Sequence, residues 1–147
     1  MKNLLFRQHY HGATFSRFLL GMRILFGVLF ITHGYSKLVN FETLSLTFPD
    51  PIGIGAELSL VLVIFAEFFC AMGFIAGFLF RLTLLPMIFA MGVAFFMAHG
   101  GSVVNGELAL IYLVVFLMML LAGPGRYSVD KLIHFITCDE PVCEWKI

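Results

Sequence analysis

Charged side chains are scarce in this sequence. Only 12% of its 147 residues are Asp, Glu, Lys or Arg, whereas a typical soluble domain contains about 25%. Hydrophobic residues make up 61% of the chain, which excludes a water-soluble globular domain and predicts an integral membrane protein. The net charge is zero and the basic residues are scattered, which argues against a nucleic-acid partner because no basic stripe follows a phosphate backbone.

Cysteine is also rare, with three residues in the chain. Cys138 and Cys143 are separated by more than the two residues of a zinc or redox motif. We therefore expect ordinary reduced thiols in a cytoplasmic tail. Cys70 lies within an apolar run and is expected to be a small packing residue. A Gly-rich phosphate-binding loop is absent as well.

Long apolar runs dominate the rest of the chain. They cover residues 16–38, 56–80, 82–98 and 106–122, close to the roughly 20 residues that a membrane-spanning helix needs. Arg23 interrupts the first run and no cleavage site follows it, which predicts a retained span and not a signal peptide. We predict an all-α integral membrane four-helix bundle at residues 16–136, preceded by a segment 1–15 and followed by a tail 137–147.

The basic residues predict the orientation of these spans. Seven of them fall on one side of the predicted bundle: Lys2, Arg7, Arg17, Arg81, Arg126, Lys131 and Lys146. Lys37 stands alone on the other side. Because Lys and Arg are retained in the cytoplasm, both termini are predicted there, in a multi-pass protein of a bacterial cytoplasmic (inner) membrane. Ser128 can cap a short interfacial helix whose apolar side begins at Leu132.

The first two spans are predicted to pack against each other. In the first span, five residues recur at helical spacing on one face: Arg23, Gly27, Phe30, Gly34 and Lys37. The second span offers small residues for close approach: Ala66, Cys70, Gly73 and Gly77.

Glu67 is an ionisable residue near the middle of the second span. A charged group at that depth costs roughly 2.5–3.5 kcal/mol on insertion scales and is by default a functional-site hypothesis. We predict that Arg23 is its counter-ion and that the two form a buried ion pair that handles a proton. Two alternatives stay open: Arg23 extends to the headgroups while Glu67 is protonated or bonded to Thr32, or the pair is purely structural.

A second polar group gathers near the opposite ends of the spans. It comprises His33, Tyr35, Glu57, His99, Asn105 and Glu107. Together with Phe95, the residues His33, Tyr35, His99 and Glu107 are candidates for binding a flat, lipid-soluble cofactor such as a quinone. Haem or metal binding has no diagnostic spacing here and no metal ligand is assigned. The alternative is that these residues only anchor the helix ends at the interface.

These residues resemble the DoxX family of small four-span membrane proteins. The match includes the face from Arg23 to Lys37, then Glu67, Gly73, Gly77 and Arg81. Its most specific block runs from Gly123-Pro124-Gly125-Arg126 to Tyr127-Ser128-Val129-Asp130. The resemblance implies a cytoplasmic-membrane protein linked to redox systems, since the family's namesake is a membrane subunit of a thiosulfate:quinone oxidoreductase that works with a partner subunit.

Three classes of function follow from the residues and the resemblance. The first is an accessory or quinone-interacting membrane subunit of a redox complex, with Glu67 and Arg23 at the site and a soluble or membrane partner. The second is a non-enzymatic structural or chaperone-like scaffold. The third is a small-solute carrier, for which a homo-oligomer would supply the pathway.

Overall fold

The computed structural model describes residues 12–137, which form helices joined by loops without any strand in that range. In chain order the helices are α2 (Gly12–Val39), α3 (Phe41–Leu44), α4 (Ala56–Ile64), η1 (Phe65–Cys70), α5 (Ala71–Ala76), α6 (Phe80–Val93), η2 (Ala94–Ala98), α7 (Glu107–Ala122) and α8 (Val129–Thr137). The segments η1 and η2 are π-helical and continue α4 and α6 without a break. The tail cysteines Cys138 and Cys143 lie outside the described residues.

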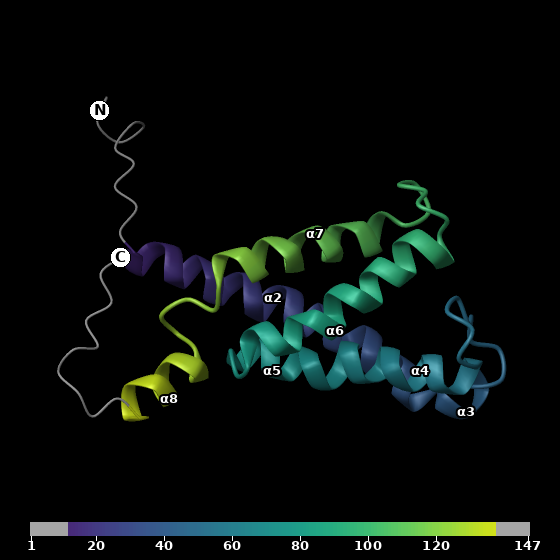
Figure 1. Ribbon diagram of the computed structural model, residues 1–147, viewed down its shortest axis with the longest axis horizontal. Helices are drawn as coiled ribbons and strands as arrows, with labels where there is room; N and C mark the ends of the chain where they lie inside the picture. Colours follow the sequence, from purple (N-terminus) through teal and green to yellow (C-terminus); the bar gives the residue numbers. More distant parts are fainter. Residues whose placement is uncertain (1–11, 138–147) are drawn as a thin grey trace.

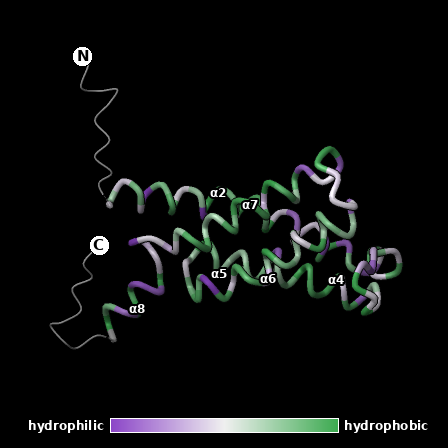
Figure 2. Tube along the Cα trace, turned by 45° about the horizontal axis from the view of Figure 1, so that its top comes forward, coloured by the Kyte–Doolittle hydropathy of each residue, from purple (hydrophilic) through white to green (hydrophobic). Residues whose placement is uncertain are grey.

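Four apolar helical stretches form the bundle, as predicted. Residues 12–39, 56–76 and 80–98 are each long and apolar enough to cross a bilayer, and α7 adds a shorter apolar helix of 16 residues. These bounds differ from the predicted ones by at most four residues. Hydrophobic residues run along the helices and hydrophilic ones gather mainly near their ends (Figure 2). The fold class is therefore confirmed as a helical membrane bundle.

The connections define two ends of the bundle (Figure 1). One end, which we call the loop end, carries α3, the loop 45–55 and the turn 99–106. The other end, which we call the turn end, carries the tight connection 77–79 between α5 and α6, and also α8. The count of basic residues predicts that the loop end faces away from the cytoplasm.

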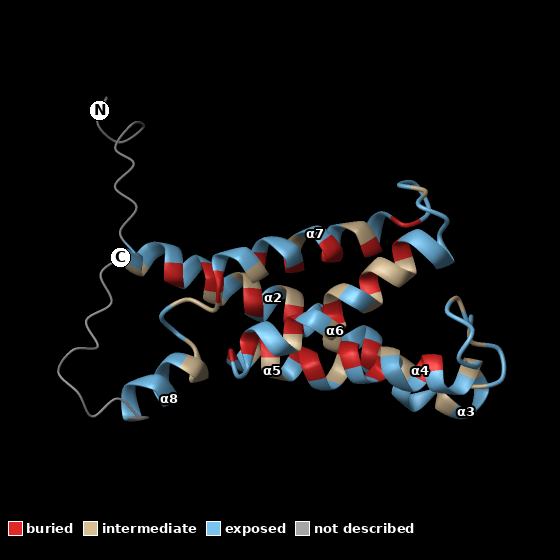
Figure 3. Cartoon of the chain, viewed as in Figure 1, coloured by how far each residue is buried: buried red, intermediate tan, exposed pale blue. Residues whose placement is uncertain are grey.

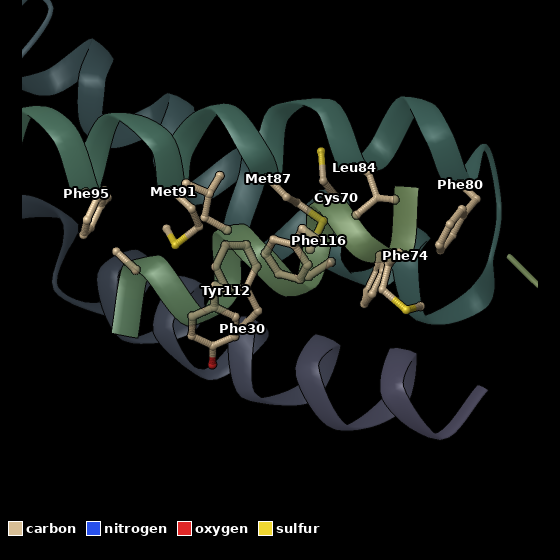
Figure 4. Close-up of a cluster of buried hydrophobic side chains, with 14 of the residues drawn as sticks. Phe30, Cys70, Phe74, Phe80, Leu84, Met87, Met91, Phe95, Tyr112 and Phe116 are labelled. Atoms are coloured by element: carbon tan, nitrogen blue, oxygen red, sulfur yellow. The ribbon is translucent and has the colours of Figure 1, made fainter. Parts of the chain in front are cut away.

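Aromatic side chains fill the centre of the bundle. Phe30 of α2 lies 5.0 Å from Phe116 of α7, and Phe74 of α5 lies 5.5 Å from both Phe80 and Phe116, measured between ring centroids. Figure 4 shows these rings in contact across the helices. Buried residues lie on the inward faces while large apolar residues cover the outside (Figure 3). In a bilayer that outer surface faces lipid.

Glycines on α2 allow it to approach η1 and α5 closely. A Cβ atom at Gly34 would lie 2.8 Å from the backbone carbon of Glu67, and one at Gly27 would lie 3.3 Å from the Phe74 ring. The predicted packing of the first two spans is therefore confirmed. Gly73 differs from its predicted role, because it faces Thr83 of α6, whose methyl group would lie 2.7 Å from an added Cβ.

Candidate functional site

Glu67 lies in η1, is only 3% exposed, and forms an ion pair with Lys37 of α2. The Lys37 side chain is 25% exposed, so its partner is the more deeply buried group. The prediction that Arg23 is the counter-ion of Glu67 is therefore wrong. The alternative hydroxyl partner is also wrong, since the Thr32 hydroxyl donates a hydrogen bond to the Leu29 carbonyl oxygen.

The register of α2 against the second span explains this difference. Arg23 and Lys37 lie on the same face of α2, about 21 Å apart at 1.5 Å per residue. The contact of Gly34 with the Glu67 backbone places the last turns of α2 beside η1. Lys37 is one turn beyond Gly34 and reaches the carboxylate, whereas Arg23 lies level with the end of α5.

Arg23 serves the turn end of the bundle. Its guanidinium is buried and donates hydrogen bonds to four backbone carbonyl oxygens. Two of them belong to Phe74, at 3.0 Å, and Ile75, near the end of α5; the other two belong to Pro124, at 2.9 Å, and Tyr127, at 2.7 Å. Carbonyls at a helix end lack helical partners, so Arg23 supplies a donor at the end of α5, where the Phe74 oxygen also accepts from the Gly77 amide at 3.2 Å. The same guanidinium ties α5 to the segment that follows α7.

Asp130 completes this arrangement on the other side of the α5–α6 turn. Its carboxylate accepts hydrogen bonds from the backbone amides of Leu79, at 2.7 Å, and Phe80, at 2.9 Å, while its own amide donates to the Gly77 carbonyl oxygen at 3.0 Å. A carboxylate at the start of α6 is favourable for the helix dipole. The segment from Gly123 to Asp130 is therefore joined to the turn end of the bundle by hydrogen bonds.

Two cavities meet at the ion pair of Lys37 and Glu67. The first, which we call the apolar cavity, measures about 330 Å³ and lies between the second and third spans under the loop 45–55. Apart from the ion pair, its lining consists of apolar residues and Ser59. Its principal walls are Phe48, Pro49, Pro51, Phe65, Pro86 and Phe89.

The second cavity, which we call the polar cavity, measures about 190 Å³ and lies between α2, η2 and α7. It shares Lys37, Glu67, Met91 and Ala94 with the apolar cavity. The polar cavity is further lined by Phe30, His33, His99, Leu108, Ala109 and Tyr112. The ion pair is therefore the boundary between an apolar chamber and a polar one.

Both π-helical segments face these cavities. Glu67 belongs to η1, and Ala94 at the start of η2 lines both cavities. A π-helical turn interrupts the regular i→i−4 ladder and is frequent at functional sites. Nothing in the apolar pattern of either span distinguishes a π-helical turn from an α-helical one, so sequence reasoning missed both segments.

The structure brings together some of the predicted site residues and separates others. His33 and His99 line the polar cavity beside Glu67. Tyr35 lies outside both cavities with its ring 6.5 Å from that of Phe68, Phe95 is buried in the core, and Glu107 is exposed at the start of α7. Among the described residues, His, Cys, Asp and Glu nowhere form a group of three or more that could hold a metal ion.

Asp50 holds the loop 45–55 over the apolar cavity. Its carboxylate accepts hydrogen bonds from the amides of Ile54, at 3.0 Å, and Gly55, at 2.7 Å, and from the Ser59 hydroxyl at 2.9 Å. These bonds tie the loop to the first turn of α4. As a result, Phe48 and its neighbouring prolines form the cover of the cavity.

This loop should loosen in acid. Hydrogen bonding, above all from the Gly55 amide, lowers the pKa of Asp50 below its ordinary value. A carboxyl whose pKa is depressed by folding stabilises the fold above its unfolded pKa of about 3.9 and loses that effect as the pH falls through its folded pKa. We expect the Ile54 and Gly55 amides to exchange with deuterium faster, relative to intrinsic rates, below about pH 4.

Asp50→Asn should speed this exchange already at neutral pH and abolish its dependence on acid. Glu57→Gln is the control, because Glu57 is an exposed carboxylate in the first turn of α4, the helix to which Asp50 ties the loop. Exchange rates of Asp50→Asn equal to those of the wild type would show that the carboxylate does not hold the loop.

Comparison with known proteins agrees with this architecture. The DoxX family model matches residues 18–100, more than half of the chain and including Arg23, Lys37 and Glu67. A curated relative, the inner membrane protein YqjF of Escherichia coli (strain K12), is 32% identical over 117 residues, which cover 76% of this chain and 88% of the relative. No solved structure matches the chain. The predicted location in the inner membrane is supported by this relative and by the apolar helices. The chain therefore belongs to the DoxX family.

Proposed function

We propose that this protein is a quinone-binding membrane subunit of a redox complex, with the quinone ring in the apolar cavity and its oxygen at the ion pair of Lys37 and Glu67. The observation that carries the proposal is the ion pair itself, which lies at the inner boundary of an otherwise apolar chamber. Ligand sites commonly combine apolar walls with a few polar groups that orient the ligand.

The residues of the cavity fit such a ring. A volume of about 330 Å³ is within the range of small-molecule sites, roughly 300–1,000 Å³. Phe65 and Phe89 offer aromatic faces, while Pro86 and Ala90 leave room between the spans. The Lys37 ammonium can donate a hydrogen bond to a carbonyl oxygen and the Glu67 carboxylate can accept one from a hydroxyl, so both the oxidised and the reduced form find a partner.

A groove on the outer surface supports a ligand with an apolar tail. It measures about 810 Å³, runs between α5 and α6, and shares Phe65, Pro86 and Phe89 with the apolar cavity. Its remaining lining is apolar except for Thr83. A ring in the cavity and a tail along this groove would suit a lipid-soluble quinone better than a small polar solute.

Binding of a short-tailed quinone analogue to the purified protein in mild detergent tests the proposal. Glu67→Gln should weaken binding at least about tenfold, because hydrogen bonds to charged groups are worth about 1.5–3 kcal/mol. Glu107→Gln is the matched control, since Glu107 is exposed and lies outside both cavities. Equal affinities of wild type and Glu67→Gln would remove the ion pair from the site.

The scaffold alternative has one observation in its favour. Arg23 and Asp130 act on backbone groups of the turn end, and neither lines the apolar or the polar cavity. A protein without quinone affinity whose turn-end variants lower the level of a partner subunit would favour a scaffold over a quinone-binding subunit.

A further inference from the structure

The polar cavity connects a buried carboxylate with the surface at the loop end. Glu67 is 3% exposed and Tyr112 is 4% exposed, whereas His33 and His99, which line the same cavity, are both exposed. His99 follows η2 directly and belongs to the loop end. A volume of about 190 Å³ has room for several water molecules.

The ionisable groups around Glu67 come from α2, α7 and the end of η2, and none comes from α4 or α6. From α2 come Lys37 and His33, from α7 comes Tyr112, and His99 stands at the end of η2. Glu67 interacts electrostatically with Lys37, His33 and Tyr112. The residues that α4 and α6 contribute to the two cavities include no ionisable side chain.

Toward the turn end the bundle is closed by aromatic rings. Phe30 is 1% exposed, and Phe74 and Phe116 are fully buried. These rings lie between Glu67 and the level of Arg23, and they offer no group that can carry a proton. Within the described residues, polar side chains around Glu67 therefore lead only toward the loop end.

We propose that the polar cavity is a proton path through which Glu67 exchanges protons with the aqueous phase at the loop end. The path is inferred from the lining of the polar cavity alone, whereas its role in a reaction rests on the proposed function. For each quinol oxidised to a quinone, two electrons pass to an electron-accepting partner subunit and two protons leave the hydroxyl groups. Glu67 takes these protons one at a time and returns to the carboxylate as each passes to water in the polar cavity. The partly exposed side chain of Lys37 reaches the same cavity.

Time-resolved infrared spectroscopy of the full-length protein in proteoliposomes tests this path without a quinone. The band of the protonated Glu67 carboxyl is identified by its loss in Glu67→Gln, and its response to a pH or deuterium jump gives the exchange rate. Ala109→Leu fills the polar cavity and should slow exchange about tenfold, equivalent to a barrier about 1.4 kcal/mol higher. Ala90→Leu, the same substitution in the apolar cavity alone, should leave the exchange rate unchanged.

A second variant tests the path without adding a larger side chain to the buried position of Ala109. His99→Leu removes the imidazole at the mouth of the polar cavity and should also slow exchange. The path is overturned if Ala109→Leu and His99→Leu exchange at the wild-type rate, or if Ala90→Leu is the variant that slows. Quinone affinity, measured on the same samples, separates the two proposals. Slowed exchange in Ala109→Leu without any quinone binding would support the path and refute the quinone site. Quinone binding together with unchanged exchange in Ala109→Leu would refute the path alone.

Discussion

Arg23→Ala is expected to destabilise this protein more than any other single substitution discussed above. It removes four hydrogen bonds to backbone carbonyl oxygens at the turn end, where the Phe74 oxygen keeps a bond from the Gly77 amide at 3.2 Å. Hydrogen bonds to a charged group contribute about 1.5–3 kcal/mol each and are not additive, so we expect a loss of roughly 5 kcal/mol. Thermal unfolding in mild detergent, followed by circular dichroism, measures the change, and the amount of protein in the membrane should fall with it.

Two further variants define what Arg23 does. Arg23→Lys keeps the charge but loses the planar, five-donor guanidinium, so it should recover only part of the stability. Arg17→Ala is the matched control, because Arg17 lies on the same helix, is exposed, and within residues 12–137 donates only to the Thr14 hydroxyl. If Arg23→Ala melted like the wild type but bound quinone weakly, Arg23 would belong to the ligand site and not to the turn end.

Lys37→Met is expected to have the second-largest effect. Removing one partner of a buried ion pair costs about 3–5 kcal/mol. We expect about 3 kcal/mol, because the Lys37 side chain is 25% exposed and because an unpaired buried carboxyl takes up a proton. The double variant Lys37→Met with Glu67→Met replaces both charges by apolar side chains and should regain most of the stability. Thermal unfolding of the two single variants and the double variant completes a double-mutant cycle.

The double variant separates structure from function. A folded, stable protein that no longer binds quinone would assign the ion pair to the ligand site. Retained binding in the double variant would show that the apolar walls alone hold the ligand. Independent, additive effects of the two single variants would contradict a direct pair, since contacting residues couple by about 0.5–3 kcal/mol.

Several features of the fold could be predicted from the order of the residues. Apolar runs separated by Gly, Pro and charged residues predicted four spans, because backbone groups in a bilayer are satisfied within a helix. The short helix α8 was predicted from Ser128, whose hydroxyl accepts a hydrogen bond from the Lys131 amide at 3.2 Å. Helical spacing placed Arg23, Gly34 and Lys37 on one face, and the structure confirms that this face packs inward at Arg23 and Gly34.

The partner of Glu67 could not be predicted in the same way. Both Arg23 and Lys37 lie on the correct face, and the choice between them depends on how far α2 slides along the second span. That offset is determined by the contacts of Gly27 and Gly34 with the backbone and side chains of η1 and α5. A slide of α2 by about 21 Å, roughly four helical turns, would bring Arg23 instead of Lys37 to Glu67 without altering the apolar pattern.

The amino-acid sequence by itself determined that this protein is a helical membrane protein, where its four apolar helical stretches lie, and which face of the first one turns inward, because hydropathy and helical periodicity are properties of neighbouring residues. Only the tertiary structure decided that Lys37 pairs with Glu67, that Arg23 instead secures the turn end, and that the ion pair separates an apolar cavity from a polar one. These features depend on the relative positions of helices, which are set by side-chain packing between residues far apart in the chain.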